Sequence, residues 1–427
     1  MTSALRWGSK GTSFYMSKLK FTSVLLFSLA PLALNAQTIT GTITGSVTDP
    51  SGASLAKAKV TATNVGTGIK TNAATNDAGF YSLPFLNVGQ YTVTVENPGF
   101  KKSLLGPFAL EVNQIARVDI ALQLGAVTES VEVKDFAPIL QTESSATGAS
   151  ISASQVTSIP LRGRNFASAV LLIPGAITPN PTSFDGIGAN TGGGRPYVNG
   201  NREQTNNFLL DGGDINESID NLIGYQPNVD ALQEVKVMTG NMGAEFGNAN
   251  GAVVNMTLKS GTNSMHGNVF WFLQNDNLNA NGLFSNRAGV ARREFRRNVF
   301  GGTVGGPIVK NKAFFFLDYQ GAKDRSAGPA SASLAPEAWR TGNLSGLTRS
   351  VLDPTTNAPF PGNIIPTSRI VNPAARALFA EQRLYPLPNN RGVGPLGVTS
   401  NFLGSSSSAV NNDQADAKSD IRLTEKD

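Results

Sequence analysis

The sequence predicts a mainly β protein, with a small antiparallel sandwich near the N-terminus and longer strands toward the C-terminus. Three observations predict this class. Glycine is abundant, with 45 residues in a chain of 427, and charged residues make up only 15%, which suits short strands and turns better than amphipathic helices. Apolar and polar residues alternate over many short segments. No stretch beyond the N-terminal region holds about 18 continuous apolar residues, so any membrane crossing must use β-strands.

Residues that carry chemistry in many enzymes are scarce in this chain. There is no cysteine, which excludes disulfides, zinc–thiolate sites and thiol catalysis. The single histidine, His266, cannot form a catalytic triad or a metal cluster alone. The run DGGDIN at 211–216 offers oxygen ligands but lacks the spacing of an EF-hand calcium loop, and a plain turn explains it better. We therefore expect no enzyme, no cofactor and no resident metal.

The basic residues do not form a nucleic-acid-binding surface. The formal net charge of +5 is spread along the chain. The densest basic cluster consists of Arg292, Arg293, Arg296 and Arg297. A nucleic-acid partner is not expected from so small and isolated a cluster.

The N-terminal residues 1–36 have the pattern of a secretory signal peptide. Lys18 and Lys20 precede an apolar run at 21–34, and small residues end at Ala36, after which cleavage is expected. Met16 is the more natural start, because it leaves a basic segment of ordinary length before the apolar run. The protein is therefore expected to be exported.

Residues 37–124 are expected to fold as a β-sandwich. Period-2 alternation is broken by turn sequences such as Asp49-Pro50-Ser51-Gly52, whose residue types favour tight reversals. The candidate strands cover residues 43–48, 59–64, 69–75, 79–83, 90–96 and 115–122. Short antiparallel strands at this spacing predict a small sandwich.

The sandwich sequence resembles a known domain. GSVTDPSGASLAKAKVTATN at 45–64 and TNDAGFYSLPFLNVGQYTVTVENPGF at 75–100 resemble the carboxypeptidase regulatory-like domain, which is a prealbumin-like sandwich. The name implies no peptidase, since zinc carboxypeptidase chemistry needs histidine and carboxylate ligands. Such sandwiches are sometimes grouped with carbohydrate-binding folds, but the residues define no sugar site.

Residues 155–258 resemble the plug domain of TonB-dependent outer-membrane receptors, an α+β domain. The matching pieces are IPLRGRNF at 159–166, LLIPG at 171–175, VNGNR at 198–202 and FLLDG at 208–212. A short helix is expected at 166–172, ended by Pro174 and Gly175, with strands at 234–238 and 252–258.

The resemblance implies candidate residues along a substrate path through the plug. They lie in the matching pieces and are Arg162, Gly163, Arg164, Asn165, Asn199, Gly200, Arg202, Asp211 and Gly212. Glycine-rich loops such as 184–194 can approach a ligand closely because glycine lacks a Cβ. The alternative is that these loops are flexible connections, and that the arginines pair with carboxylates of the inner barrel wall instead of anionic substrates.

Residues 259–427 resemble the start of a transmembrane β-barrel of the Oar-like group of these receptors. Strands are expected at 268–274, 298–308 and 313–320, with a candidate fourth at 417–423, and Val269, Trp271 and Leu273 are expected to face lipid. A long external loop is expected from 321 to about 412, with a helix near 373–382. A closed barrel needs at least about eight strands, so the barrel is incomplete and we expect a truncated gene or a partial gene model.

The linker at 125–154 contains a candidate TonB box, the segment that pairs strand to strand with the energy-transducing partner. Its residues are Thr128, Glu129, Ser130, Val131, Glu132 and Val133. Pairing through main-chain hydrogen bonds needs β-propensity and accessibility more than a fixed sequence. The alternative is that this segment is the last strand of the sandwich.

Taken together, the resemblance implies a TonB-dependent outer-membrane receptor or transporter, with its N-terminal domain in the periplasm. Its expected partners are a TonB-type energy-transducing protein, outer-membrane lipid, and a ligand that is a peptide, a protein or a glycan. The alternative is a secreted or surface module for adhesion or carbohydrate binding, or a non-functional truncated product. The arginines near Arg293 would lie close to lipopolysaccharide phosphates, or simply in a solvated loop.

Overall fold

The computed structural model describes residues 39–126, 130–133, 143–159, 161–178, 195–287, 289 and 291–423, with the backbone alone for 130–133 and Arg162. The predicted signal peptide, Thr128, Glu129 and the loop 184–194 lie outside these ranges. Within them, no helix is both long and apolar enough to cross a membrane. The contacts group everything after residue 37 into one unit.

The N-terminal part is a β-sandwich, as predicted. One sheet has the order β4-β1-β7, with β8 also paired to β1, and the other has the order β3-β2-β5-β6-β9. The strands are Gly41–Thr48 (β1), Lys59–Asn64 (β2), Lys70–Ala74 (β3), Phe80–Leu86 (β4), Gly89–Glu96 (β5), Lys102–Leu110 (β6), Ile115–Arg117 (β7), Ile120–Ala121 (β8) and Ser130–Val133 (β9). Alternate side chains fill the core between the sheets, and the buried Tyr81 hydroxyl donates to the Val118 carbonyl at 2.7 Å.

Two details of the sandwich differ from the prediction. The sequence does not predict β6, because Gly106-Pro107 interrupts its alternation; the strand tolerates Pro107 at a register shift opposite Tyr91–Val93. The expected strand at 115–122 is divided into β7 and β8, both of which pair parallel with β1. Parallel pairing returns the chain along the sandwich instead of closing a further hairpin.

The central region, defined here as the described residues between 143 and 259, is built on a sheet with the order β10-β15-β16-β13-β14. Its elements are Thr147–Ser152 (β10), Ala153–Ser158 (α2), Arg162–Arg164 (η1), Ala167–Val170 (α3), Ala176–Ile177 (β11), Tyr197–Val198 (β12), Glu203–Thr205 (η3), Asn207–Leu210 (β13), Gly213–Asp214 (β14), Val229–Ala231 (η4), Leu232–Gly240 (β15) and Val253–Leu258 (β16). The helix expected at 166–172 is present but shorter. Phe166 and Phe208 pack edge to face in the core, with ring centroids 6.3 Å apart.

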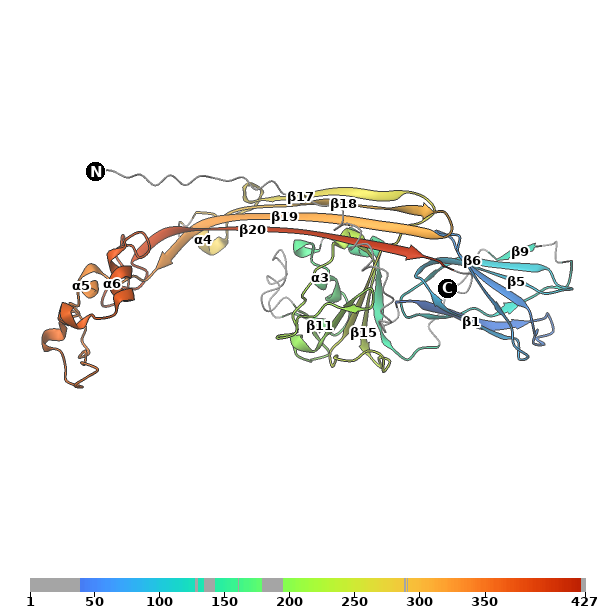
Figure 1. Ribbon diagram of the computed structural model, residues 1–427, viewed down its shortest axis with the longest axis horizontal. Coiled ribbons are helices and arrows are strands. Elements are labelled where there is room, and N and C mark those ends of the chain that lie inside the picture. The colour runs from blue at the N-terminus through green and yellow to red at the C-terminus, as the bar shows by residue number, and fades with distance from the viewer. Residues whose placement is uncertain are drawn as a thin grey trace, which may run out of the picture. The chain divides into compact units, whose positions relative to one another are not determined.

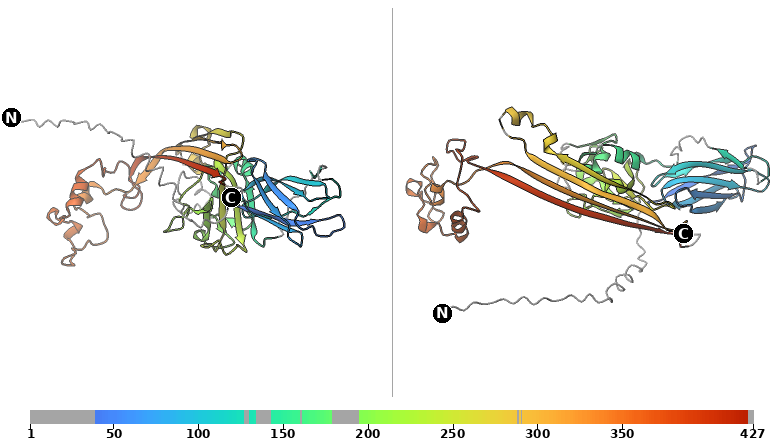
Figure 2. Two further views of the ribbon diagram at one scale, coloured as in Figure 1. Left: turned by 45° about the vertical axis from the view of Figure 1, so that its right-hand side comes forward. Right: turned by 90° about the horizontal axis from the view of Figure 1, so that it is seen from above.

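The wall is the name used here for four long antiparallel strands paired in sequence order, β17 to β20. They are His266–Asn275 (β17), Glu294–Val309 (β18), Ala313–Ala332 (β19) and Phe402–Ile421 (β20). Figures 1 and 2 show them side by side along their length. Only residues 310–312 join β18 to β19, whereas 276–293 and 333–401 are long connections, so the long connections are expected outside the membrane.

The wall strands are longer than the sequence predicts. β19 continues to Ala332 and β20 begins at Phe402, so the loop expected at 321–412 is confined to 333–401. The expected strand at 417–423 is only the last part of β20. Sequence alternation fails to reveal the extra length because these segments carry small and polar residues on both faces.

The two faces of the wall differ as a membrane strand requires. Val269, Trp271 and Leu273 are 91%, 69% and 54% exposed on one face, where lipid would cover them. On the other face Phe316 is 1% exposed and belongs to the core of the central region. One wall side chain is therefore part of the core that the central region buries.

The long connections carry short helices. The first contains Asp276–Leu278 (η5) and Leu283–Arg287 (α4); the second contains Glu337–Arg340 (α5), Pro361–Asn363 (η6), Thr367–Arg369 (η7) and Pro373–Ala380 (α6), close to the helix expected at 373–382. In the second, the Arg340 guanidinium donates to the carbonyls of Ala335 at 2.9 Å, Tyr385 at 2.7 Å and Pro386. Arg340 therefore links the start of the connection 333–401 to Tyr385 and Pro386.

Candidate functional site

The predicted site residues lie in three separate turns of the central region. Six of them, with one glycine at each turn, adopt a positive φ in the left-handed region. They are Gly163 at 62°, Arg164 at 52°, Asn199 at 52°, Gly200 at 77°, Asp211 at 46° and Gly212 at 78°. Two of the turns contact the wall, along a boundary called here the seam.

Arg164 sits at the seam between a carboxylate and two aromatic rings. Its guanidinium donates to Asp230 of the same region and lies 4.0 Å from the Phe272 ring centroid and 5.4 Å from that of Phe270, both on β17. The side chain of Asp230 is 10% exposed and that of Arg164 15%. The predicted partner was a carboxylate of the wall; the structure shows a carboxylate of the central region and an aromatic wall surface instead.

Asp230 is also the acceptor that connects the central region to β17. Its Oδ1 accepts from Asn268 Nδ2 at 2.9 Å, and Asn268 Oδ1 accepts from Thr303 Oγ1 at 2.5 Å. Lys259 Nζ donates to the Asp230 carbonyl at 2.8 Å. Burial lowers the pKa of Lys259, and the charge of Asp230 opposes that shift. Asp230 therefore accepts hydrogen bonds from Arg164 and Asn268 through its carboxylate and from Lys259 through its backbone carbonyl.

A row of polar side chains crosses the wall at this level. The register pairs Asn268 with Thr303, Thr303 with Asp318, and Asp318 with Asp416. Tyr225 donates its hydroxyl to Asp416 Oδ2 at 2.6 Å, and Asn228 Nδ2 lies 3.3 Å from Asp318 Oδ1. Burial, followed by the hydrogen bond to Asp416, raises the pKa of Tyr225, so the phenol remains a donor at neutral pH.

The ion pair between the central region and the wall has the opposite polarity to the one predicted. Lys418 Nζ of β20 lies 3.1 Å from Asp211 Oδ2 and 3.1 Å from the Leu258 carbonyl, while Leu258 N donates to Asp211 Oδ1 at 3.1 Å. Burial raises the pKa of Asp211, and Lys418 opposes the shift. The carboxylate is supplied by the turn and the cation by the wall.

The remaining predicted residues support turns. Asn165 is 1% exposed, and its Oδ1 accepts from Ala167 N at 2.9 Å at the start of α3. Asn199 Nδ2 donates to the Thr239 carbonyl at 2.8 Å. Arg202 is exposed, and Arg162 is described by its backbone alone. Their role along a substrate path stays a prediction.

Sequence reasoning missed most of the seam, namely Tyr225, Asn228, Asp230, Lys259, Asn268, Phe316, Asp318, Asp416 and Lys418. A signal for the wall residues was present. Gln414, Asp416, Lys418 and Asp420 recur at every second position, as polar residues do on the inner face of a membrane strand. The pattern begins just after the segment assigned to the loop and continues into the strand expected at 417–423.

The sequence of the chain is similar to those of known proteins. The family described as "Outer membrane beta barrel domain" matches residues 257–427, and "Carboxypeptidase regulatory-like domain" matches 42–123. The chain is 28% identical over 307 residues to the TonB-dependent transporter Oar of Myxococcus xanthus, which covers 69% of this chain. The chain is Oar-like: it resembles this transporter in sequence and carries the two domains that the family descriptions name. It spans 27% of the length of Oar.

Solved structures give partial overlaps with this Oar-like chain. The outer membrane transporter YddB of Escherichia coli aligns with a TM-score of 0.34 and 13% identity, over 44% of this chain and 27% of that one. The siderophore receptor PirA of Acinetobacter baumannii aligns with a TM-score of 0.28 and 18% identity, over 47% and 26% of the two chains. The match to the outer membrane β-barrel domain locates the Oar-like chain in the outer membrane.

In this Oar-like chain the sandwich is hydrogen-bonded to β15 of the central region at Val112. Val112 N donates to Glu234 Oε2 at 3.1 Å, and Lys236 Nζ donates to the Val112 carbonyl at 2.6 Å. Glu234 and Lys236 project from the same face of β15, two residues apart. Both peptide groups of Val112 are therefore held by charged side chains that are 6% and 7% exposed.

The folded state around this contact is expected to lose stability as pH rises. Burial, with Glu111 nearby, raises the pKa of Glu234 in the folded protein above its unfolded value of about 4.3. A raised carboxyl pKa means that ionisation costs stability; the cost is absent below the unfolded pKa and complete above the folded one. Hydrogen-exchange protection of the Val112 amide, normalised for intrinsic exchange, should fall from pH 4 toward neutrality. Glu234→Gln should flatten the dependence, and equal slopes in both proteins would contradict the assignment.

Gly261, between the central region and β17, is expected to tolerate no side chain. A Cβ there would lie well inside van der Waals contact with the carbonyl oxygens of Phe315 and Gly306. Because both obstacles are backbone atoms, Gly261→Ala should destabilise the folded chain by about 1–3 kcal/mol. Denaturant unfolding in detergent measures the loss. Gly247→Ala is the control, since nothing lies within 4 Å of its Cβ position.

Proposed function

We propose that this Oar-like chain takes part in energised uptake across the outer membrane, with the central region acting as the plug. The observation that carries the proposal is the seam. The central region is seated on the inner face of the wall by exchangeable polar contacts, including Tyr225 to Asp416 and Lys418 to Asp211. Water can replace such contacts at modest cost when a pull is applied, whereas an all-apolar boundary would resist separation.

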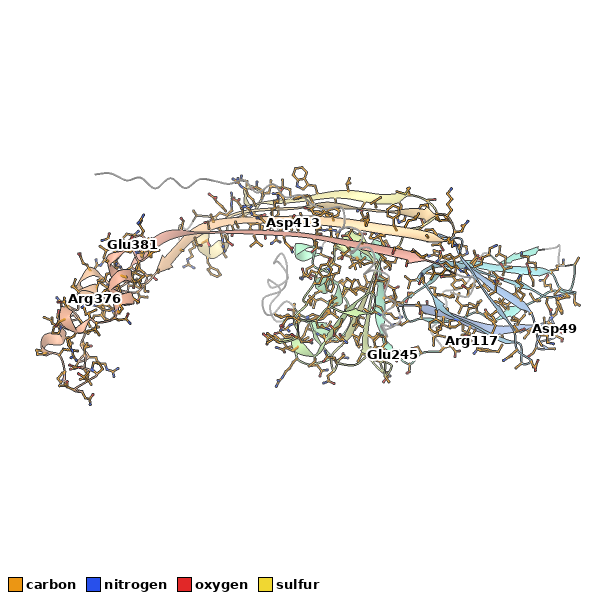
Figure 3. The ribbon with its side chains drawn as sticks, viewed as in Figure 1. Asp49, Arg117, Glu245, Arg376, Glu381 and Asp413 are labelled. Carbon is orange, nitrogen blue, oxygen red and sulfur yellow. The ribbon has the colours of Figure 1, made fainter. Side chains whose placement is uncertain are left out.

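External capture of the ligand is assigned to the segment 333–401. It carries an open pocket of about 360 Å³ whose lining includes Arg340, Ile370, Arg376, Phe379 and Leu387. Arg376 and Glu381 mark this segment in Figure 3. A cavity that combines apolar side chains with arginine suits an amphipathic ligand, and a peptide fits this description within the expected classes of peptide, protein or glycan.

The TonB-type partner is assigned to the segment that begins at Thr128. Ser130–Val133 forms β9, paired parallel to β6 at the edge of its sheet, so the box candidate is also the sandwich strand of the alternative interpretation. The two are compatible. An edge strand keeps one row of backbone groups available for an added strand.

Site-directed disulfide trapping tests this assignment cleanly, because the chain has no cysteine. Val131→Cys should cross-link to single cysteines placed along the pairing strand of a TonB-type protein in energised cells, with a two-residue periodicity. Ala74→Cys is the matched control, on the opposite edge strand β3 of the same sheet. Cross-linking that is equal at both positions, or ligand uptake that survives deletion of 128–133, would remove the partner from this segment.

A further inference from the structure

The densest arginine cluster of the sequence is divided between the two faces of the wall. Arg297 turns inward and pairs with Asp324 at 2.8 and 2.6 Å, and Arg292 pairs with Asp276 at 3.2 Å. Arg296 is exposed on the outward face. No ion pair or hydrogen bond of its side chain is found in the described ranges. The outward arginine therefore needs its own explanation.

The outward face of the wall carries an apolar band that ends in aromatic residues. Along β18 the band runs from Ile308 to Phe300, about 26 Å at about 3.3 Å per residue, close to the apolar height of about 25 Å of membrane barrels. The register places Trp271 beside Phe300. The end of the band that carries these rings is the end with the long connections, and therefore the external end.

Two polar groups of the aromatic residues fix the level of the membrane interface. Trp271 Nε1 donates to Asn298 Oδ1 at 3.1 Å, and the Tyr319 hydroxyl donates to Asp413 Oδ1 at 2.7 Å. Residues paired across the four strands form a row, and every second row faces outward. Asp413 lies on β20 (Figure 3). Each acceptor lies in the next outward-facing row beyond its donor, on the side of the external end. Tryptophan and tyrosine adopt this arrangement where apolar lipid gives way to headgroups.

Three exposed cations follow in the next two rows. Lys323 pairs in register with Asn298, and its Nζ lies 5.5 Å from the Phe300 ring centroid. One row further out, Arg296 lies directly opposite Arg325. Like charges directly opposite each other on adjacent strands destabilise a sheet. An anion between them would reverse that cost.

The protein itself does not supply the anion in the part of the chain that is described. Arg325 donates to the carbonyls of Asp324 at 2.8 Å and Val410 at 3.3 Å and to Asn411 Oδ1 at 2.8 Å, all of them neutral acceptors. Asp413 already accepts from Tyr319, and Glu294, the nearest carboxylate along β18, is exposed and forms no ion pair with Arg296 there. Arg296 and Arg325 therefore form no ion pair with a carboxylate in the described ranges.

We propose that Arg296, Lys323 and Arg325 bind the phosphorylated headgroup of an outer-leaflet glycolipid whose acyl chains cover the apolar band below. Guanidinium groups match phosphate oxygens with two parallel hydrogen bonds, and Lys323 adds a point charge. The site lies on the lipid-facing surface, away from the seam, so it is independent of the transport proposal.

The test is retention of a defined lipid by the full chain, reconstituted in phosphatidylcholine nanodiscs that contain a small fraction of bisphosphorylated lipid A, with bound lipid read by native mass spectrometry. Arg296→Gln with Arg325→Gln should reduce retention about tenfold. Lys310→Gln with Lys312→Gln removes the same charge from the short turn at the opposite rim and should leave retention unchanged. Circular dichroism confirms that each variant is folded.

Three results would overturn the proposal. They are equal losses in both variant pairs, equal retention of lipid A from which the phosphates have been removed, and equal retention of phosphatidylglycerol, which would indicate general attraction to anionic lipid. Arg296→Lys with Arg325→Lys keeps the charge but loses the paired hydrogen bonds of guanidinium, so it should restore only part of the retention.

Discussion

Replacement of Asp230 with alanine is expected to destabilise the central region by about 3–5 kcal/mol. The substitution leaves Arg164 with its charge largely buried and without its carboxylate, and breaking such a pair costs far more than the pair itself contributes. It also removes the acceptor of Asn268 on β17. Denaturant unfolding in detergent should show an early transition for the central region, with loss of protease protection.

The matched control for this prediction is Asp220→Ala. Asp220 is an exposed carboxylate of the same region, and a surface change of this kind should stay within about 0.5 kcal/mol. A double variant, Arg164→Met with Asp230→Ala, should recover part of the stability, because no charge is then left uncompensated. An Asp230→Ala protein as stable as the control would show that Arg164 is adequately solvated.

Phe316→Ala is expected to have a comparable effect, about 3–5 kcal/mol, because it empties a fully enclosed aromatic site. Phe316 comes from β19 but packs in the core with residues such as Phe166 and Phe208 of the central region. Its loss should therefore lower hydrogen-exchange protection in β15 and β16 as well as in β19. No residue of the central region is altered, so shared loss of protection measures coupling across the seam.

Leu317→Ala provides the comparison for Phe316. Leu317 is the next residue on the same strand and is 45% exposed on the outward face. Its truncation should leave the central region protected, since only lipid or detergent contacts are lost. If Phe316→Ala likewise affected β19 alone, the central region would have a core of its own that does not need the wall.

The sandwich was the most predictable part of the fold because apolar and polar residues alternate at every second position along its strands. Each face is either core or water, so alternation in sequences such as QYTVTVE at 90–96 translates directly into a strand. β10 escaped prediction because Thr147–Ser152 is made mostly of small residues, and it is a strand through its pairing with β15. That pairing is tertiary information, which local pattern cannot supply.

The sequence could predict the types of residue at the seam, but not which residues pair with each other. The sequence resemblance indicated that arginines and carboxylates meet near the wall, but the choice of partners depends on register. Lys418 reaches Asp211 because β20 is paired along its whole length with β19, from Phe402 to Ile421. A strand assigned only to 417–423 leaves Asp416 in a loop, where its bond to Tyr225 has no reason to exist.

The surplus length of β19 and β20 has a mechanical consequence. Each strand has 20 residues, whereas about 9–11 suffice to cross a bilayer, so the β19–β20 pair continues for about 30 Å past the lipid surface, with β18 paired beside it as far as Ala327. The cavity-bearing segment at its tip is thus held well outside the lipid surface. Under the proposed function, ligand recognition and membrane passage take place at different heights, and a ligand bound at the tip must travel along the strand pair before uptake.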